Sequence, residues 1–423
     1  MRRPPSLCTA LFAAAGLIVA MTACSSDSAN RAPTTTAATT PAVTRVDDGV
    51  LTIGVLTPQG SANADIGHSI ATAVALATKK INEAGGYRGQ PVVLVAEDEG
   101  VAGVGIDPAI AALLDAHVDA IIGPASSTNA LAGLGEIVDA GVVACSPTAS
   151  ASLLDDFPDR NLFFRTIPSD SLQALAIGEA VDRTGASRAT VAYIDDPYGQ
   201  AFADSIAASL QAKGIQQTES VPYSTNNQSI RAGAAKVAAL AAGVVVVIGD
   251  STSGPVMLGA IDSDEHVTSP VYVVNDAMRR PTASAEPMSV SLTKRITGVS
   301  PVAYSTDPQF LSDLGATPDD PSPYAANAFD CVNLIALAAL ASQSTQPTAI
   351  AGMIPAVSDS GTPCTTFADC RADIEAGSNI NYDGPGGPVS INSKGELSAA
   401  NFQFFGFDET GRDYNKATVP VHP

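Results

Sequence analysis

The sequence predicts an α/β fold with two similar lobes, in which helices flank both faces of each parallel sheet. Short apolar strands alternate with helices over short loops, a pattern typical of parallel sheets covered by helices. This alternation runs from about residue 50 to residue 150 and restarts near residue 161. The chain has 423 residues, too many for one hydrophobic core, so two lobes are expected.

The first lobe is predicted to begin with a buried strand at 50–56, followed by a helix that Gly85 and Gly86 end. The apolar residues of this helix recur at helical spacing and are Ile66, Ile70, Val74 and Ile81. The next predicted elements are strands at 91–97, 120–123 and 142–145 and helices at 107–116 and after residue 128.

The second lobe is predicted to repeat this order. Its clearest strand is the β-branched run at 244–248, which has the composition of a strand buried on both faces. Its other elements are strands at 161–167, 189–194 and 271–274, helices at 170–185 and 199–214, and an extended run at 295–303.

The C-terminal third contains two further patterns. Residues 325–342 are almost wholly apolar but fall short of the ~20 residues of a membrane span, so they predict a helix within a core. Residues 388–391 and 402–407 alternate in hydrophobicity and predict an antiparallel hairpin.

The N-terminus predicts an exported protein. Arg2 and Arg3 precede a short apolar stretch, which is typical of a signal peptide over residues 1–23. Small residues then precede Cys24, as in a bacterial lipobox, so Cys24 is expected to carry lipid and anchor the protein to the outer face of the cell membrane. An ordinary secretory signal with a chance cysteine is the alternative. The Ser/Thr/Ala/Pro-rich residues 24–46 predict a disordered tether.

The net charge and the cysteines indicate which binding partners and crosslinks the chain can have. The formal net charge of −21 argues against nucleic acid, whose binding depends on Lys and Arg that neutralise phosphates. Cys364 and Cys370 bracket a short loop in an exported chain and predict a disulfide, with no metal because no histidine adjoins them. Cys145 and Cys331 lie in apolar segments, where they are either core residues or a second disulfide.

Two clusters of hydroxyl residues follow neighbouring predicted strands. The clusters comprise Ser126, Ser127 and Thr128 after one strand and Thr148, Ala149 and Ser150 after the next. Ligands of open α/β sheets lie at the carboxyl ends of strands, and a helix N-terminus there favours an anion. We therefore expect these clusters to bind a ligand carboxylate, although one cluster alone would be read as a helix cap.

Acidic residues in the second lobe complement that anion site. Asp276 ends a predicted strand and, if it faces the hydroxyl clusters, pairs with a ligand ammonium; otherwise it is a loop acid. Asp170 is either a helix cap or a ligand contact. Tyr198 is either a pocket wall or a turn residue.

An enzyme is not expected. The sequence around Ser251, GDSTSG, is similar to serine hydrolase signatures, but a nucleophilic serine needs a base. None of the four histidines lies in a recognisable motif, and motifs for zinc proteases, nucleotides and redox pairs are lacking. A serine hydrolase that uses Ser251 is the weaker alternative, and no catalytic residue, cofactor or metal is predicted.

Between about Leu51 and Phe407 the chain resembles the branched-chain amino-acid (Leu/Ile/Val) binding proteins, the solute-binding proteins of ABC importers with the type I periplasmic fold. Its matching segments, in order, are IGVLTPQG, KKINEAGGYRGQPVVLVAEDEG, AIIGPASST, VVACSPTAS, FFRTIPSD, VAYIDDPYGQ and NYDGPGGPVSINSKGEL. The resemblance implies two Rossmann-like lobes joined by a three-strand hinge, a ligand cleft between them, and closure around a small solute.

Position by position, the resemblance implies ligand contacts from Ser127, the Ala149 backbone and Ser150, with Ser126 adjacent. It places Asp170, Tyr198 and Asp276 across the cleft, where the family usually has Glu at the position of Asp276. The aromatic pocket residue that is common in the family near Ile66 is missing from this chain. A second aromatic residue of the family is replaced here by Asp250 and Ser251. The predicted ligand is thus an amino acid, branched-chain-like or more polar, or a small amide or urea-like solute.

The resemblance also implies crossovers near 167–169, 296–299 and 375–380. The expected first lobe is 47–168 plus 298–376, and the second is 169–297 plus 377–423. The expected partner is an ABC permease in the membrane, and the expected state is a monomer. A sensor of the same fold that signals through a partner protein is the main alternative.

Overall fold

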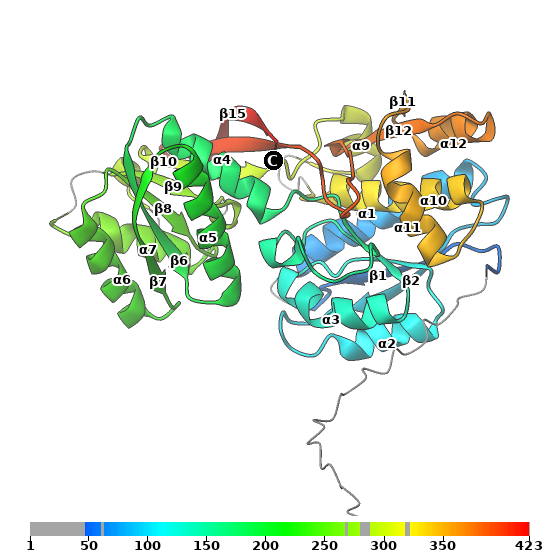
Figure 1. Cartoon of the computed structure of the whole chain (residues 1–423), viewed down its shortest axis with the longest axis horizontal. Coiled ribbons are helices and arrows are strands. Elements are labelled where there is room, and N and C mark those ends of the chain that lie inside the picture. Colours follow the sequence, from blue (N-terminus) through cyan, green and yellow to red (C-terminus); the bar gives the residue numbers. More distant parts are fainter. Residues whose placement is uncertain (1–46, 61–62, 267–269, 280–287, 318–321, 423) are drawn as a thin grey trace, which may run out of the picture. The chain divides into compact units, whose positions relative to one another are not determined.

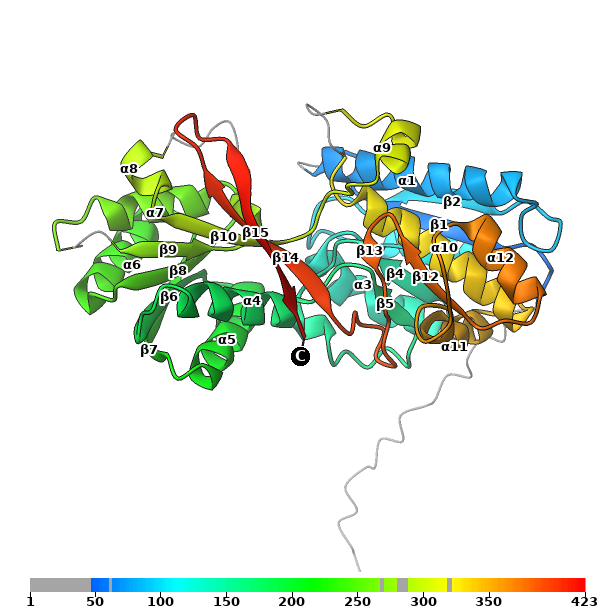
Figure 2. The same cartoon turned by 90° about the horizontal axis from the view of Figure 1, so that it is seen from above.

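The computed structural model describes residues 47–60, 63–266, 270–279, 288–317 and 322–422. The predicted signal peptide, Cys24 and the predicted tether lie outside these ranges. Within them the chain forms two α/β lobes around separate sheets (Figures 1 and 2). The predicted fold class is confirmed.

The first lobe contains a five-stranded sheet in which all neighbouring strands run parallel, in the order β2-β1-β3-β4-β5. The strands are β1 (Thr52–Thr57), β2 (Val93–Asp98), β3 (Ala120–Ile122), β4 (Val143–Ser146) and β5 (Phe163–Arg165). The helices are α1 (Ala64–Glu83), α2 (Asp107–Asp115), α3 (Ser127–Asp139), α9 (Pro308–Leu314), α10 (Ala325–Ser342), α11 (Pro347–Val357) and α12 (Phe367–Glu375). Helices α2 and α3 lie on one side of the sheet, and α1, α10 and α11 lie on the other (Figure 1).

The second lobe contains a seven-stranded sheet in the order β15-β14-β10-β9-β8-β6-β7. Strands β6 to β10 pair in parallel, whereas β10 with β14 and β14 with β15 pair antiparallel. The strands are β6 (Arg188–Ile194), β7 (Gln216–Tyr223), β8 (Val244–Ile248), β9 (Val271–Val274), β10 (Ile296–Pro301), β14 (Ala400–Phe407) and β15 (Asp413–Val421). The helices are α4 (Asp170–Asp182), α5 (Pro197–Ala212), α6 (Asn227–Leu240), α7 (Ser253–Asp262) and α8 (Val290–Thr293).

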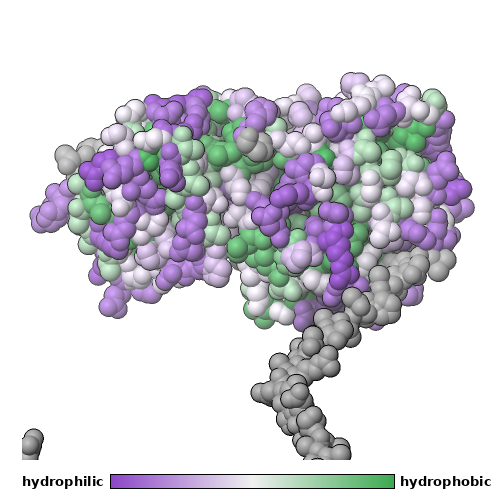
Figure 3. All heavy atoms as spheres, in the orientation of Figure 1, coloured by the Kyte–Doolittle hydropathy of each residue, from purple (hydrophilic) through white to green (hydrophobic). Residues whose placement is uncertain are grey.

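Strand β8 shows why this sheet needs helices on both faces. Val244, Val246 and Ile248 pack into the core on one side of the sheet, and Val245 and Val247 pack into the core on the other. Successive strand side chains point to opposite faces, so a continuous β-branched run requires two buried faces. On the outer surface, hydrophilic residues and small apolar patches alternate over the face shown in Figure 3.

Helix α10 is the central helix of the first lobe. All fifteen residues at 325–339 are buried, among them Asp330 and Asn333. It is the one helix of the described ranges that is long and apolar enough to cross a membrane, and 89% of it is buried inside the lobe. Burial of this extent agrees with the predicted core helix.

Two disulfides are present in the first lobe. Cys364, in the short strand β11 (Thr362–Cys364), pairs with Cys370 in α12, as predicted. Cys145, in β4, pairs with Cys331 in α10, which decides the alternative that the sequence left open. The second bridge joins the sheet to its covering helix, immediately before the loop that carries Thr148 and Ser150.

The C-terminal segment differs from the prediction in two respects. Phe402 and Phe404 lie in β14, whose antiparallel partner is β15, so the predicted hairpin with 388–391 is wrong. Residues 380–397 were assigned to the second lobe, yet Ile380, Tyr382 and Leu397 pack into the first-lobe core. They include the short strands β12 (Ile380–Gly384) and β13 (Gly387–Pro388), and β12 pairs with β11. The third crossover therefore follows residue 397 instead of lying near 375–380.

Candidate functional site

The two predicted hydroxyl clusters lie side by side at the carboxyl ends of β3 and β4. Ser146 joins them, because its hydroxyl donates to the carbonyl of Pro124 at 2.7 Å and accepts from the N–H group of Ala149 at 2.9 Å. Thr148 adds a second link by donating to the carbonyl of Ala125 at 2.8 Å. The two strand-end loops are thus tied together by buried hydrogen bonds.

These hydroxyls differ in what they can offer a ligand. The Ser127 hydroxyl accepts from the N–H group of Ala151 at 3.2 Å, so its own proton is available for donation. The Thr148 proton is already used, and Ser126 accepts from the N–H group of Asn129 as the N-cap of α3. The N–H group of Ala149 is also engaged, which disfavours the ligand contact expected from its backbone.

Glu99, which no sequence motif identifies, occupies part of the predicted anion site at the N-terminus of α3. The side chain is 2% exposed and accepts from the N–H groups of Ala125 and Ser126 at 2.6 and 3.1 Å. Burial raises the pKa of Glu99 to about 7, against the opposing effect of these hydrogen bonds. In the sequence, Glu99 is marked only by its position in the acidic run that ends the predicted strand at 91–97. A carboxylate here repels a second anion, so Ser127 is the better candidate for a ligand carboxylate.

Asp170 lies at the start of α4, where the chain passes from the first lobe to the second. Its N–H group donates to the carbonyl of Ser150 at 2.8 Å, which places the two predicted contact residues side by side. Asp170 is 1% exposed, and neither carboxylate oxygen meets a donor at full hydrogen-bond geometry among the described residues. The Ser150 and Tyr198 side chains are nevertheless near enough to interact with it. Burial and the nearby charge of Asp276 raise the pKa of Asp170 to about 7, although the Ser150 side chain favours the charged form.

Asp276 faces Asp170 from the turn after β9. It is partly buried, and its Oδ1 atom accepts from the Nε2 atom of Gln173 at 2.9 Å. Gln173 is fixed by a second hydrogen bond to the carbonyl of Val299. Burial raises the pKa of Asp276, while the bond from Gln173 acts in the opposite direction. Gln173 was not singled out by the sequence, because its role depends on tertiary contacts.

Two tyrosines complete this acidic cluster. Burial, followed by the charges of Asp170 and Asp276, raises the pKa of Tyr198 well above its usual value. The pKa of Tyr324, at the N-terminus of α10, is raised by burial and by Asp276. We call Asp170, Asp276, Tyr198 and Tyr324 the acidic cluster. Tyr324 has no motif that could have identified it.

Other predicted site residues lie outside this cluster. Asp250 accepts from the N–H group of Thr252 at 2.8 Å in the turn before α7, and its charge acts on Tyr223 instead of on the acidic cluster. Ile66 is half-buried in α1 and packs against the first-lobe core. Within the described residues, no hydrogen bond joins Ser251 to a histidine, and no group of three metal-binding side chains occurs.

Two cavities lie away from the predicted contacts. One of about 520 Å³ is lined by Thr166 and Tyr304, from the first two crossovers, and by Asn401, at the start of β14. Another of about 440 Å³ lies in the first lobe against Phe310, Phe329 and other residues. Neither is lined by the hydroxyl clusters, Asp170 or Asp276.

Comparison with known proteins gives consistent results. The sequence profile described as periplasmic binding protein matches residues 50–411. The substrate-binding protein BasB of a chemotactic signal transduction system in Halobacterium salinarum is 31% identical over 363 residues, which are 81% of this chain and 83% of BasB.

Solved structures share the fold. The branched-chain amino-acid transporter substrate-binding protein LivJ of Streptococcus pneumoniae, in complex with isoleucine, has a TM-score of 0.63 and 18% identity, and the match covers 88% of this chain and all of LivJ. A solute-binding protein of an R. palustris ABC transporter, in complex with 4-hydroxybenzoate, has a TM-score of 0.67 and 18% identity, covering 88% of this chain and 98% of that one.

Proposed function

This chain belongs to the periplasmic binding protein family, and we propose that it is an extracytoplasmic receptor that closes its two lobes around an amino acid or a similar small amine-bearing solute. The observation that carries the proposal is the buried carboxylate of Asp170, whose oxygens meet no donor at full hydrogen-bond geometry among the described residues and which experiences the nearby charge of Asp276.

An ammonium group is the ligand chemistry that this pair of carboxylates favours. An unsatisfied buried polar group costs about 1–3 kcal/mol, and more when it is charged. The mutual repulsion of Asp170 and Asp276 adds to that cost. A ligand cation between the two side chains would remove both the cost of the unsatisfied carboxylate and the repulsion between the two charges. It would also form charge-assisted hydrogen bonds.

The opposite end of the ligand is expected to be a carboxylate. Ser127 retains a donor proton, and Ser150 lies between the Ser127 loop and Asp170. Glu99 and the acidic cluster disfavour a ligand with net negative charge. A zwitterion therefore fits better than a simple aromatic acid such as the 4-hydroxybenzoate bound to the R. palustris protein.

The side chain of the ligand is expected to be small or polar. Asp276 is shorter than the glutamate usual in the leucine-binding relatives, and its carboxylate is part of the acidic cluster. Polar amino acids are therefore included with isoleucine and leucine as candidate ligands. Ile66 and Tyr198 would border this part of the site, with Thr148 and Ala149 holding the loop behind Ser150.

A thermal-shift screen tests the proposal. Each amino acid is compared with the carboxylic acid that lacks its amine, together with small amides, ureas and 4-hydroxybenzoate. One class of amine-bearing ligand is expected to raise the melting temperature according to RT ln(1 + [L]/Kd). If no compound stabilises the protein, or if the deaminated acids do so equally well, the proposal is wrong.

Transport and sensing are both compatible with this site. We propose an exported, monomeric, non-enzymatic lipoprotein anchored through Cys24 that delivers ligand to an ABC permease. BasB supports the alternative of a receptor that signals through a partner protein, because its name assigns it to chemotaxis. Loss of labelled-ligand uptake in a deletion strain would favour transport, whereas normal uptake with lost attraction to the ligand would favour sensing.

A further inference from the structure

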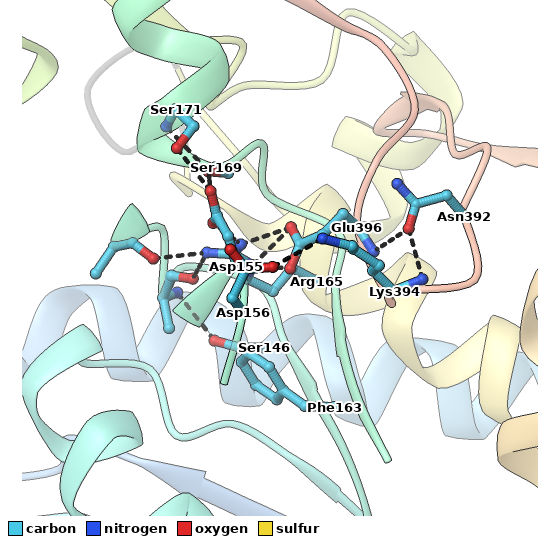
Figure 4. A network of polar contacts seen from close by, with 12 residues as sticks. Ser146, Asp155, Asp156, Phe163, Arg165, Ser169, Ser171, Asn392, Lys394 and Glu396 are labelled. Atoms are coloured by element: carbon cyan, nitrogen blue, oxygen red, sulfur yellow. Dashed lines mark hydrogen bonds and ion pairs between the residues drawn. The ribbon is translucent and has the colours of Figure 1, made fainter. Parts of the chain in front are cut away.

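Arg165, at the end of β5, is the centre of a polar network that joins three segments of the first lobe (Figure 4). Its side chain is completely buried. The Nε atom donates to both carboxylate oxygens of Glu396, at 3.0 and 2.9 Å, and Nη2 pairs with Asp155 at 2.5 Å. We call Arg165, Asp155 and Glu396 the Arg165 cluster.

The guanidinium group of Arg165 holds both neighbours of Ser150. Its Nη1 atom donates to the carbonyls of Ala149 and Ala151, at 3.3 and 3.1 Å. Because the residues before and after Ser150 are bound to one rigid planar group, the position of Ser150 between them is restricted.

Asp155 holds both neighbours of Asp170, as Arg165 holds both neighbours of Ser150. Its carboxylate accepts from the hydroxyl of Ser169 at 2.8 Å and from the hydroxyl of Ser171 at 2.6 Å. These two serines flank Asp170, and Figure 4 shows both pointing toward Asp155. The Arg165–Asp155 ion pair thus links the neighbours of Ser150 to the neighbours of Asp170.

Glu396 extends the network to the segment that precedes the third crossover. The N–H group of Arg165 donates to the carbonyl of Gly395 at 2.9 Å, so both backbone and side chain hold this turn. A Cβ atom at Gly395 would lie 2.0 Å from the carbonyl oxygen of Phe163, which requires glycine for this close approach. The turn before the third crossover is therefore bonded to the same arginine that holds the neighbours of Ser150.

We propose that the Arg165 cluster positions Ser150 and Asp170 for ligand binding, so that Arg165, Asp155 and Glu396 determine affinity without touching the ligand. This inference rests on the proposed function. Every bond of this network is formed by groups of the chain itself, so the network restricts the separation of the two contact residues without any contribution from a ligand. A network that served only the stability of the first lobe would not affect the ligand.

Asp155→Asn tests the proposal, with Asp262→Asn as a matched control. Asp155 and Asp262 have similarly exposed side chains, 25% and 18%, and each pairs with one arginine. Asp262 binds Arg295 in the second lobe, away from both contact residues. Both variants are expected to lower the melting temperature.

The affinity of the two variants for an amino acid distinguishes a role in positioning Ser150 and Asp170 from a general loss of stability. Calorimetry is performed with isoleucine and with whichever amino acid stabilises the wild type most. We expect Asp155→Asn to weaken binding at least tenfold and Asp262→Asn to change it less than twofold. Equal loss in both variants, or unchanged affinity in Asp155→Asn, would overturn the proposal.

Hydrogen–deuterium exchange of the ligand-free protein tests positioning without a ligand. Asp155→Asn should accelerate exchange at the amides of Ala151 and Asp170, whereas Asp262→Asn should not. Wild-type exchange at these amides in Asp155→Asn would contradict the inference. If the wild type binds no amino acid, the proposed function fails, and this exchange result alone decides whether the cluster holds the two loops.

A second variant covers the case in which Asp155→Asn does not fold. Ser171→Ala removes one hydroxyl donor to Asp155 but keeps the ion pair with Arg165. We expect a three- to tenfold loss of affinity with a small change in melting temperature. Unchanged affinity and unchanged exchange at Asp170 in this variant would again overturn the proposal.

Discussion

The loops at the ends of β3 and β4 and the acidic cluster opposite them are both polar, but they differ in how their polar groups are satisfied. In the loops, Ser126, Ser146, Thr148 and the backbone of Ala149 already have partners within the chain. In the acidic cluster, neither carboxylate oxygen of Asp170 meets a donor at full hydrogen-bond geometry among the described residues. The loops are thus a preformed wall, whereas the acidic cluster gains most from a ligand, and ligand selection is expected to depend on it.

Asp170→Asn is the strongest test of this contrast. Loss of one member of a buried charge pair costs about 2–5 kcal/mol, so affinity for an amino acid should fall roughly 30-fold or more. The ligand-free variant should melt at a higher temperature at pH 8, because a neutral amide removes the unsatisfied charge. Calorimetry and thermal unfolding measure the two effects. Unchanged affinity would move the ammonium site elsewhere.

Lowering the pH should separate stability from binding. The pKa of Asp170 is raised from 3.8 to about 7, so the folded state binds a proton more tightly than the unfolded state. The contribution of Asp170 to stability is therefore lost as pH rises from about 4 to about 7. Affinity should rise over the same interval, because an ammonium ligand needs the ionised carboxylate.

The difference between wild type and Asp170→Asn isolates this contribution, since Glu99 and Asp276 also have raised pKa values. We expect wild-type affinity to fall by up to about tenfold per pH unit below pH 7 and the variant to show a flatter profile. Parallel pH profiles would show that Asp170 does not bind the cation.

Gln173→Leu should have an intermediate effect. It removes the hydrogen bond that orients Asp276 but leaves both charges in place. A single hydrogen bond to a charged group contributes about 1.5–3 kcal/mol, so we expect at least a tenfold loss of affinity. Gln200→Leu, at an exposed residue of α5 that bonds Tyr193 and Asp204 instead of Asp276, is a control that should bind normally in the same titration.

The smallest effects are expected in the loops. Ser127→Ala should weaken binding by roughly three- to tenfold, because it removes one neutral donor worth about 0.5–1.5 kcal/mol. Ser126→Ala should lower stability by about 1 kcal/mol through loss of the α3 cap and leave affinity within twofold. If Ser126→Ala impaired binding more than Ser127→Ala, our assignment of the two serines would be reversed.

The sequence predicted the features that depend on local pattern. The run at 244–248 and the apolar helix at 325–342 appear where expected, because burial on all sides leaves a continuous apolar signal. The segment 380–397 was misassigned because it is rich in glycine and forms only short strands, so its lobe is decided by distant contacts with α10 and β11.

The same distinction applies to the candidate site. Asp170 and Asp276 were recognisable because the first begins a predicted helix and the second follows a predicted strand. Glu99, Arg165 and Gln173 were not, because an exposed polar residue and a buried one look alike in a single sequence. Their roles follow from burial and from partners tens to hundreds of residues away.

The bridge between Cys145 and Cys331 also has a topological consequence. The 186-residue separation encloses all parallel strands of the second lobe and the first two crossovers in one covalent ring. The part of the second lobe from β6 to β10 is thus a loop whose two ends are joined within the first lobe, whereas β14 and β15 lie outside the ring. A single backbone cut anywhere in that loop would therefore leave one covalent molecule until a reductant opened the ring.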